Sequence, residues 1–446
     1  MSKVYRFMRG ARCNAWTARF AATSTWASFA TAAVDEAASH RPSTSGQEVL
    51  VSSKELSAAS VGAYYSLDRA LLQEASRPYA GAFYSPREPG HERRGGCKAL
   101  QEEMAATGRN AVMYRPVMHT LFSAVGANSQ ANTNHQRLML TGPAGAGKSI
   151  ALLSLVEWAR QQGWIVMYVP SCAALVQGGY FARRGSSRRW DTLTSAQQLL
   201  KGVLDAHGAQ LKQIPVLSLE VQQQPAEGQT VAQDAAEVAS CNPSVSPGAL
   251  TAAHQDSPGR TLHDLVAGGL VGDDNAEMAV DSVLELVRQL VAASSPNGGN
   301  KNSIPVLFAL DDYNYLYGTA DYGWYSPNDD PRKARRRPIH TDDLVLASGL
   351  RLLDAPHLGL TTVVAANTTA LSLPAPVVPE LRMPHMELVV PGFTEAETRN
   401  ALAHYHATGF ASCLATSRQA RQLHALTQGN ARELRINAST LGLQLS

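Results

Sequence analysis

The sequence predicts an α/β fold in which helices flank a parallel β-sheet. Three observations predict it: short apolar runs alternate with helical patterns, a glycine-rich motif separates the first apolar run from a helix, and a later apolar run ends in two aspartates. Strands that alternate with helices favour a parallel sheet, because each helix carries the chain back to the edge where the next strand begins. We expect this domain to span residues 135–390.

The expected strands are short and almost entirely apolar, as strands buried on both faces of a sheet are. They are Leu138–Leu140, Trp164–Val169, Ile304–Leu310 and Thr361–Ala366. Helices are expected from Ile150 to Gln161 and from Ala276 to Ala292, where apolar residues recur at helical spacing.

Three further regions flank or interrupt this domain. Residues 48–134 mix short helical patterns with Pro/Gly breaks and predict an extended N-terminal arm that docks elsewhere. Residues 222–258 are rich in Gln, Ala, Ser, Pro and Gly without periodic apolar positions, which predicts a flexible insertion. Residues 391–446 predict a helical lid of two helices around a turn at Gly429-Asn430.

The N-terminal segment, residues 1–47, has the composition of an organelle transit peptide followed by an unstructured stretch. Its first 34 residues contain no acid, and apolar residues recur there at helical spacing. Mitochondrial targeting is favoured over chloroplast targeting, and a disordered basic tail is the alternative. The basic residues of the segment are Lys3, Arg6, Arg9, Arg12 and Arg19.

Charge and cysteine content exclude several classes of protein. Without the five basic residues of the N-terminal segment, acids outnumber bases by three, so nucleic-acid binding would need local basic patches. No apolar stretch reaches about 18 residues, which predicts no membrane span. Five scattered cysteines without CxxC spacing predict neither a disulfide framework nor a zinc site.

The glycine-rich motif is a complete GxxxxGK[ST] phosphate-binding loop from Gly142 to Ser149. Glycines let successive backbone N–H groups turn toward phosphate oxygens, and the following helix adds the positive end of its dipole. Lys148 is expected to reach the β- and γ-phosphates, and the hydroxyl of Ser149 to bind Mg²⁺. The alternative is a glycine-rich turn that binds nothing. The residues expected to contact nucleotide are Gly142, Pro143, Ala144, Gly145, Ala146, Gly147, Lys148, Ser149 and Ile150.

Two aspartates, Asp311 and Asp312, end the apolar strand that begins at Ile304. A carboxylate at that position holds Mg²⁺ in phosphate-loop NTPases, and we assign this role to Asp311. Asp312 is the candidate catalytic residue, because a second acid can orient or deprotonate an attacking water. A solvated pair of acids at a strand end is the alternative for both.

Two more polar residues are candidate nucleotide contacts. Asn367 ends the strand Thr361–Ala366, where a polar side chain can meet the γ-phosphate or the attacking water. Arg432 follows the Gly429-Asn430 turn and can reach the phosphates from the helical lid. An ordinary turn asparagine and a surface arginine at a helix start are the alternatives.

The sequence motifs do not identify the base of the nucleotide. The Asn-Lys-x-Asp element with which small GTPases read guanine is absent from the sequence. The segment from Tyr114 to Met118 is a candidate for reading the base in another way. GTP and ATP therefore both stay open on the motifs alone.

Two basic clusters in loops rich in Gly, Ser, Pro or Asp predict contact with RNA. Their charges suit phosphate contacts, and Trp190 beside the first cluster can stack on a base. A solvated run of charges is the default alternative. The clusters are Arg183, Arg184, Arg188 and Arg189, and Arg332, Lys333, Arg335, Arg336 and Arg337.

The order of these parts resembles the death-associated protein 3 family, GTP-binding proteins of the mitochondrial small ribosomal subunit. The resemblance implies an AAA-like P-loop NTPase domain in the head of that subunit, in the mitochondrial matrix. It also implies bound GTP or GDP with Mg²⁺, and it implies ribosomal RNA and neighbouring ribosomal proteins as partners. The matching segments, within residues 115–446, are Leu140–Ser149, Gly163–Pro170, Ile304–Gly318, Pro391–Glu397 and Gly429–Leu434.

The resemblance leaves two functional readings open. In the first, the chain is a structural ribosomal protein whose nucleotide mainly stabilises the fold without turnover. In the second, it is an active AAA-like or STAND-type NTPase that acts as a switch or an assembly factor. Family members tend to lack a second acid after the magnesium-binding aspartate, whereas this chain has Asp312 there.

Overall fold

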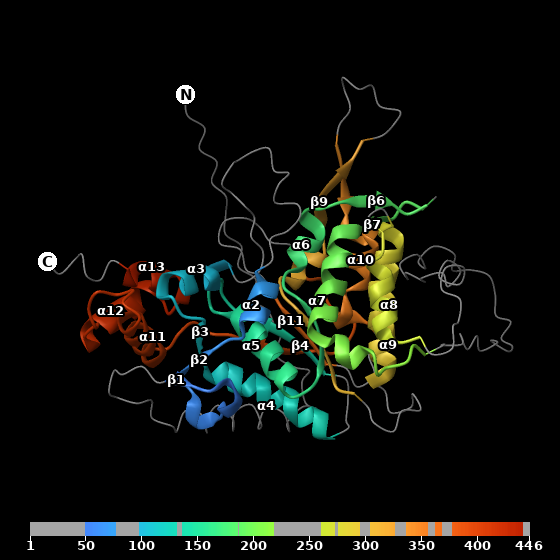
Figure 1. Cartoon of the computed structure of the whole chain (residues 1–446). Coiled ribbons are helices and arrows are strands. Elements are labelled where there is room, and N and C mark those ends of the chain that lie inside the picture. The colour runs from blue at the N-terminus through green and yellow to red at the C-terminus, as the bar shows by residue number, and fades with distance from the viewer. Residues whose placement is uncertain are drawn as a thin grey trace, which may run out of the picture.

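A five-stranded, all-parallel sheet forms the centre of the molecule (Figure 1). The computed structural model describes residues 50–76, 98–131, 136–185, 187–217, 260–272, 275–294, 304–325, 336–355, 362–367 and 377–439. The strand order is β12-β4-β11-β8-β5, and the predicted α/β class with a parallel sheet is confirmed. The strands are β4 (Gln136–Thr141), β5 (Ile165–Val169), β8 (Val306–Leu310), β11 (Thr362–Ala366) and β12 (Met386–Val389).

Four of these strands are the apolar runs expected from the sequence, and β12 is the one that the sequence did not predict. Its residues alternate between partly buried and exposed, and β12 pairs only with β4 at the edge of the sheet. A half-exposed edge strand carries a charged residue, here Glu387, and so lacks the continuous apolar run that marks a buried strand.

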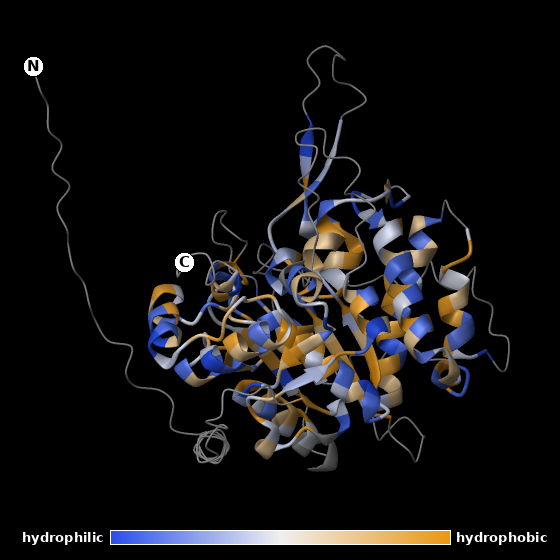
Figure 2. Ribbon diagram, turned by 60° about the vertical axis from the view of Figure 1, so that its left-hand side comes forward, coloured by the Kyte–Doolittle hydropathy of each residue, from blue (hydrophilic) through white to orange (hydrophobic). Residues whose placement is uncertain are grey.

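Helices cover both faces of the sheet, because successive side chains of a strand point to opposite faces. On β4, Leu138 and Leu140 join a core with helices α4 and α5, whereas Met139 joins a separate core with α7, α8 and α9. Figure 2 shows the hydrophobic residues gathered on the central strands and hydrophilic residues on the outer faces of the helices. These helices are α4 (Pro116–Ala131), α5 (Lys148–Gln161), α7 (Leu193–Leu211), α8 (Leu262–Gly269) and α9 (Ala276–Ser294).

The extended N-terminal arm that the sequence predicted is not confirmed in the described residues. Its described part packs on its own chain: Tyr65 and Leu71 share a core with Leu138 of the sheet, and Tyr64 and Met113 pack with the C-terminal helices. The sequence patterns here are short, so the long-range packing partners could not be read from them. The elements are β1 (Leu50–Val51), β2 (Tyr64–Ser66), α2 (Arg69–Ala75), α3 (Lys98–Thr107) and β3 (Ala111–Met113), with the three strands in one small sheet.

Three C-terminal helices follow β12, where the sequence predicted two. They are α11 (Glu395–Ala407), α12 (Ser417–Thr427) and α13 (Ala431–Ala438). Thr394 and Thr416 begin α11 and α12 with capping boxes, in which side chain and backbone at the helix start satisfy each other. Figure 1 shows the three helices in red beside α3 and β3, and the predicted turn at Gly429-Asn430 joins α12 to α13.

Two antiparallel strand pairs extend from the same end of the molecule (Figure 1). They are β6 (Phe181–Arg183) with β7 (Trp190–Thr192), and β9 (Thr319–Trp324) with β10 (Arg337–His340). The sequence predicted loops in both places. We refer to these two pairs as the hairpin end.

Short elements complete the described chain. They are α6 (Cys172–Gln177), α10 (Val345–Gly349) and the 3-10 helices Ser53–Glu55, Ala58–Ser60, Tyr313–Leu316, Thr341–Asp343 and Leu352–Asp354. No helix in the described ranges is long and apolar enough to cross a membrane. The expected transit peptide and the expected insertion at residues 222–258 lie outside the described residues.

Candidate functional site

The glycine-rich loop, residues 142–149, connects β4 to α5 at the carboxyl edge of the sheet. Helix α5 begins at Lys148, two residues before the predicted start, so the loop runs directly into a helix N-terminus. Gly142, Gly145 and Gly147 have φ angles of +132°, +78° and +96°, a region that residues with a Cβ rarely adopt. The curled backbone expected of this motif is therefore present.

Lys148 lies with its ammonium group among the carbonyls of its own loop. The side chain is only 7% exposed, and Nζ donates hydrogen bonds to the carbonyl oxygens of Gly142 and Pro143 at 2.7 and 2.8 Å. Burial lowers the pKa of Lys148, and the nearby carboxylates of Asp311 and Asp312 act in the opposite direction. Lys148 thus lies near both acids that follow β8, and its role in binding phosphate stays a prediction.

Asp311, at the end of β8, is 2% exposed. Its Oδ1 accepts a hydrogen bond from the backbone N–H of Asp312 at 3.0 Å, while Oδ2 is buried and has no hydrogen-bond partner in the described part of the chain. Burial and then the charge of Asp312 raise the pKa of Asp311 to about 8, against the lowering effect of the Ser149 hydroxyl. A buried, unpartnered carboxylate oxygen beside a hydroxyl is an oxygen donor set that fits Mg²⁺, which Ser149 and Asp311 would hold.

Asp312 adopts a left-handed backbone conformation, with φ of 56°. Its Oδ2 accepts a hydrogen bond from the hydroxyl of Ser171 at 2.5 Å, next to the start of α6. The carboxylate is therefore already engaged. The assignment of Asp312 as a catalytic base stays a prediction, and it requires this hydrogen bond to be exchanged for one to water.

Asn367 follows β11, which lies between β4 and β8. Its backbone N–H donates to the carbonyl oxygen of Leu140 at 3.0 Å, so Asn367 lies at the same edge as the glycine-rich loop. Its Oδ1 is buried and has no hydrogen-bond partner among the described residues. The register of the parallel strands brings Asn367 and Asp311 to the edge where the loop begins, and the contact of Asn367 with nucleotide stays a prediction.

Arg432 differs from Lys148 and Asp311 because its side chain is exposed. It is the second residue of α13, and its backbone N–H donates to Oδ1 of Asn430 at 3.0 Å. Its side chain is exposed and makes no hydrogen bond or ion pair within the described ranges. The predicted reach of Arg432 to the phosphates stays a prediction.

Two residues that contact the loop were not assigned this role from the sequence. The guanidinium of Arg115 donates to the carbonyl oxygen of Ala146 at 2.7 Å, and Nδ2 of Asn430 donates to that of Ala144 at 2.8 Å. Both come from outside the loop. The only local signal was the Gly429-Asn430 turn, which shows that α13 begins there but not what the asparagine touches.

The segment proposed to read the base is mostly buried. The side chains of Tyr114, Arg115 and Met118 are 1%, 4% and 1% exposed and take part in packing or in hydrogen bonds. Within that segment, Pro116 and Val117 are partly accessible. The nature of the base is untested.

The described members of the two basic clusters lie at the hairpin end. Trp190 of β7 lies 6.2 Å from Trp324 of β9, measured between ring centroids, and the guanidinium of Arg337 lies 5.2 Å above the Trp324 ring. Arg184 is ion-paired with Asp191 and Asp281 at 2.9 and 2.6 Å and is not available to a ligand. Exposed members are Arg183, Arg188, Arg336 and Arg337, Arg189 is partly exposed, and Arg332, Lys333 and Arg335 lie outside the described residues.

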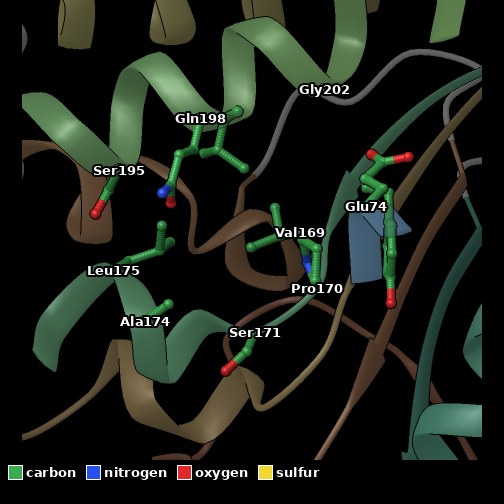
Figure 3. A pocket seen from close by; sticks show the side chains of 11 residues that line it. Glu74, Val169, Pro170, Ser171, Ala174, Leu175, Ser195, Gln198 and Gly202 are labelled. Carbon is green, nitrogen blue, oxygen red and sulfur yellow. The ribbon is translucent and has the colours of Figure 1, made fainter. Parts of the chain in front are cut away.

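A small pocket lies at the end of β5, between α6 and α7 (Figure 3). Ser171 and Leu175 line it from the side of α6, and Ser195 and Gln198 line it from α7. Its volume of about 50 Å³ holds a few water molecules and is too small for a nucleotide. The candidate nucleotide site is therefore the sheet edge around the glycine-rich loop.

A family model described as mitochondrial ribosomal death-associated protein 3 matches residues 112–370, more than half of the chain. The chain belongs to this family. The predicted resemblance is thereby confirmed, and with it a mitochondrial ribosomal protein. The match includes the glycine-rich loop, Asp311 and Asn367, whereas the three C-terminal helices lie beyond it. Among curated proteins, none matches the chain.

Proposed function

We propose that the chain is a structural component of the small subunit of the mitochondrial ribosome, in the matrix. In this proposal the glycine-rich loop binds GTP or GDP with Mg²⁺, and the nucleotide mainly stabilises the folded protein. The observation that carries it is the convergence at one sheet edge of the curled loop, Lys148 and the unpartnered oxygen of Asp311.

The chemistry of these groups suits a triphosphate with its metal. The loop amides and the N-terminus of α5 offer partial positive charge, and Lys148 adds a full one. Ser149 and Asp311 offer the hard oxygen ligands that Mg²⁺ takes. A cation beside Asp311 favours its ionised form, which burial alone disfavours.

Stabilisation follows because the binding groups come from separate parts of the chain. The loop, Asp311 and Asn367 meet only in the folded protein, so a ligand that contacts all three binds the folded state alone. A ligand at about 100 times its dissociation constant then stabilises the fold by about 2.7 kcal/mol.

The same proposal gives the hairpin end a role in binding small-subunit ribosomal RNA. Its exposed arginines, among them Arg183, Arg188 and Arg337, suit phosphate contacts. The ring of Trp190 is partly exposed and offers a surface on which a base can stack. Neighbouring ribosomal proteins would cover other surfaces.

Incorporation into ribosomes tests the proposal. We expect Lys148→Ala to lose nucleotide and to enter the small subunit poorly, because its fold lacks the ligand's stabilisation. Lys201→Ala is the matched control, since Lys201 is an exposed lysine of α7. Sedimentation on a gradient, followed by extraction of the nucleotide, measures both effects. Normal incorporation of nucleotide-free Lys148→Ala would contradict the stabilising role.

The alternative is an active AAA-like or STAND-type NTPase that acts as a switch or assembly factor. It is favoured by the buried, unpartnered Oδ1 of Asn367, which lies at the edge where a γ-phosphate or an attacking water would stand. Release of inorganic phosphate from GTP by the purified chain distinguishes the two. Turnover that Asp312→Asn abolishes supports the NTPase, and the absence of turnover supports the structural role.

A further inference from the structure

Two side chains from distant parts of the chain hold two carbonyl groups of the glycine-rich loop. Arg115, just before α4, donates through Nη1 to the carbonyl oxygen of Ala146 at 2.7 Å. Asn430, at the start of α13, donates through Nδ2 to the carbonyl oxygen of Ala144 at 2.8 Å. The two carbonyl groups held in this way are those of Ala144 and Ala146.

Arg115 also ties the loop to the beginning of α11. Its guanidinium forms a two-point ion pair with Glu397 at 2.7 and 3.4 Å, and Nη2 donates to the carbonyl oxygens of Pro391 and Gly392 at 3.0 Å each. The guanidinium also lies 4.9 Å from the centre of the Phe393 ring. The side chains of Arg115 and Glu397 are 4% and 7% exposed, so solvent does little to weaken these bonds.

Asn430 is fixed in orientation, because both ends of its side-chain amide are used. Oδ1 accepts from the backbone N–H groups of Arg432 and Glu433 and so caps α13, while Nδ2 faces the loop. The approach is close: a Cβ on Gly145 would collide with the Asn430 side chain. Glycine at position 145 therefore permits this contact as well as the positive φ angle.

Because of the geometry of the peptide group, these two contacts also fix the direction of neighbouring amide N–H groups. In a trans peptide, the C=O and the following N–H point in opposite directions. Fixing the carbonyl of Ala144 directs the N–H of Gly145 to the opposite side, and fixing the carbonyl of Ala146 does the same for the N–H of Gly147. Gly145 and Gly147 are two of the loop amides expected to face phosphate.

We infer that Arg115 and Asn430 are positioning residues which couple the C-terminal helices to the glycine-rich loop. The docked α11–α13 unit holds the loop amides in the orientation that an anion needs. By thermodynamic reciprocity, nucleotide bound at the loop tightens the docking of the three helices. The second half of this inference depends on the proposed nucleotide site, whereas the first half concerns the protein alone.

Three variants of the full-length chain test the coupling. Arg115→Gln removes the ion pair and the contact to Ala146. Asn430→Ser keeps a good helix cap for α13 but is too short to reach Ala144, so it separates positioning from capping. Arg160→Gln is the matched control, because Arg160 also forms a two-point ion pair with a glutamate, Glu74 at 2.8 and 3.2 Å, without a hydrogen bond to the loop.

Hydrogen exchange without nucleotide is the first measurement. We expect amides of residues 144–148 to exchange at least about tenfold faster in Arg115→Gln and Asn430→Ser than in the unaltered chain, and those of α11 to do so in Arg115→Gln. Arg160→Gln should leave the loop unchanged. Unaltered loop exchange in both Arg115→Gln and Asn430→Ser would overturn the inference. Should Arg115→Gln fail to fold, Asn430→Ser decides alone.

Titration with GTP and Mg²⁺ is the second measurement. The inference predicts at least about tenfold weaker binding in Arg115→Gln and Asn430→Ser, and slower exchange in α11–α13 of the unaltered chain when GTP is bound. Equal affinity in all variants would overturn the coupling. Failure of the unaltered chain to bind GTP would instead contradict the proposed function, and the loop exchange would still judge the positioning role.

Discussion

The carboxyl edge of the sheet and the hairpin end both carry charged residues that the sequence singled out, yet these residues differ in their burial. At the edge, Lys148 and Asp311 are buried and lie close to each other. At the hairpin end, Arg188 and Arg337 are exposed. Because the first set is buried, its electrostatic interactions are strong and depend on geometry. The charges of the second set face solvent, where salt screens them. The same residue types thus suit a bound small molecule in one place and a polyanion in the other.

The largest expected effect is on nucleotide affinity, when one charged side chain is removed from each region in turn. Lys148→Ala should weaken nucleotide binding by at least about 100-fold, which is about 2.7 kcal/mol, because the substitution removes the ammonium group that is expected to contact phosphate. Arg188→Ala should leave that affinity unchanged. Titration calorimetry with GTP and Mg²⁺ measures both, and similar losses in the two variants would remove the distinction between the regions.

The hairpin end contains one arginine that behaves like the buried set. Arg184→Ala should lower the free energy of unfolding by about 2–3 kcal/mol, because it leaves the buried carboxylate of Asp191 without its partner. Arg188→Ala should lower it by less than about 0.5 kcal/mol. Chemical denaturation measures both. Equal stability of the two variants would show that the Arg184 ion pairs do not hold the hairpin.

Glu157, a buried acid of α5, predicts that the free energy of unfolding depends on pH. Burial raises the pKa of Glu157 to about 7, above its ordinary value of 4.5, so the folded state holds a proton that the unfolded state releases. The contribution of this group to stability therefore falls as pH rises from about 4.5 to 7 and stays low above that range. Glu157→Gln should raise the free energy of unfolding at pH 8 by on the order of 1–2 kcal/mol and have little effect at pH 4.

The control for this effect is an exposed acid next to the hairpin end. Asp343→Asn, in the 3-10 helix that follows β10, should leave the pH dependence of unfolding as it is in the unaltered chain. Thermal unfolding between pH 4 and pH 8 makes the comparison. A Glu157→Gln curve that runs parallel to that of the unaltered chain would contradict the raised pKa.

The smallest effects are expected for single exposed arginines and RNA. Arg188→Ala or Arg337→Ala should weaken binding to small-subunit RNA a few-fold and reduce the dependence of affinity on salt by about one ion each. Trp190→Ala should weaken binding with little change in the salt dependence, because stacking does not release counterions. Filter binding at several salt concentrations separates the two, and unaltered RNA affinity in all three would remove the RNA role of this surface.

The fold was predictable where a local pattern sufficed. The order of β4, the glycine-rich loop and α5 follows from one motif between an apolar run and a helical stripe, and the register of parallel strands then brings Asp311 to the loop. β12 could not be predicted, because a half-exposed edge strand has no continuous apolar run. The sequence favours loops at the hairpin strands, because these strands are three to six residues long and lie next to segments rich in Arg, Ser, Gly and Pro.

The roles of single residues were harder to predict, because they depend on contacts across the chain. Arg115 and Glu397 are 282 positions apart, and Arg184 and Asp281 are 97 apart. No local pattern marks such a pair. Arg184 therefore looked like an RNA ligand, and Arg115 looked like part of a base-reading segment.

The most direct test of the central claim is a density map of the native mitochondrial small subunit at the glycine-rich loop. We expect a guanine nucleotide there, with Mg²⁺ beside Ser149 and Asp311, and with the ammonium of Lys148 turned from the carbonyls of Gly142 and Pro143 to phosphate. A loop without nucleotide, in which Lys148 keeps both of those carbonyl contacts in the assembled particle, would contradict it.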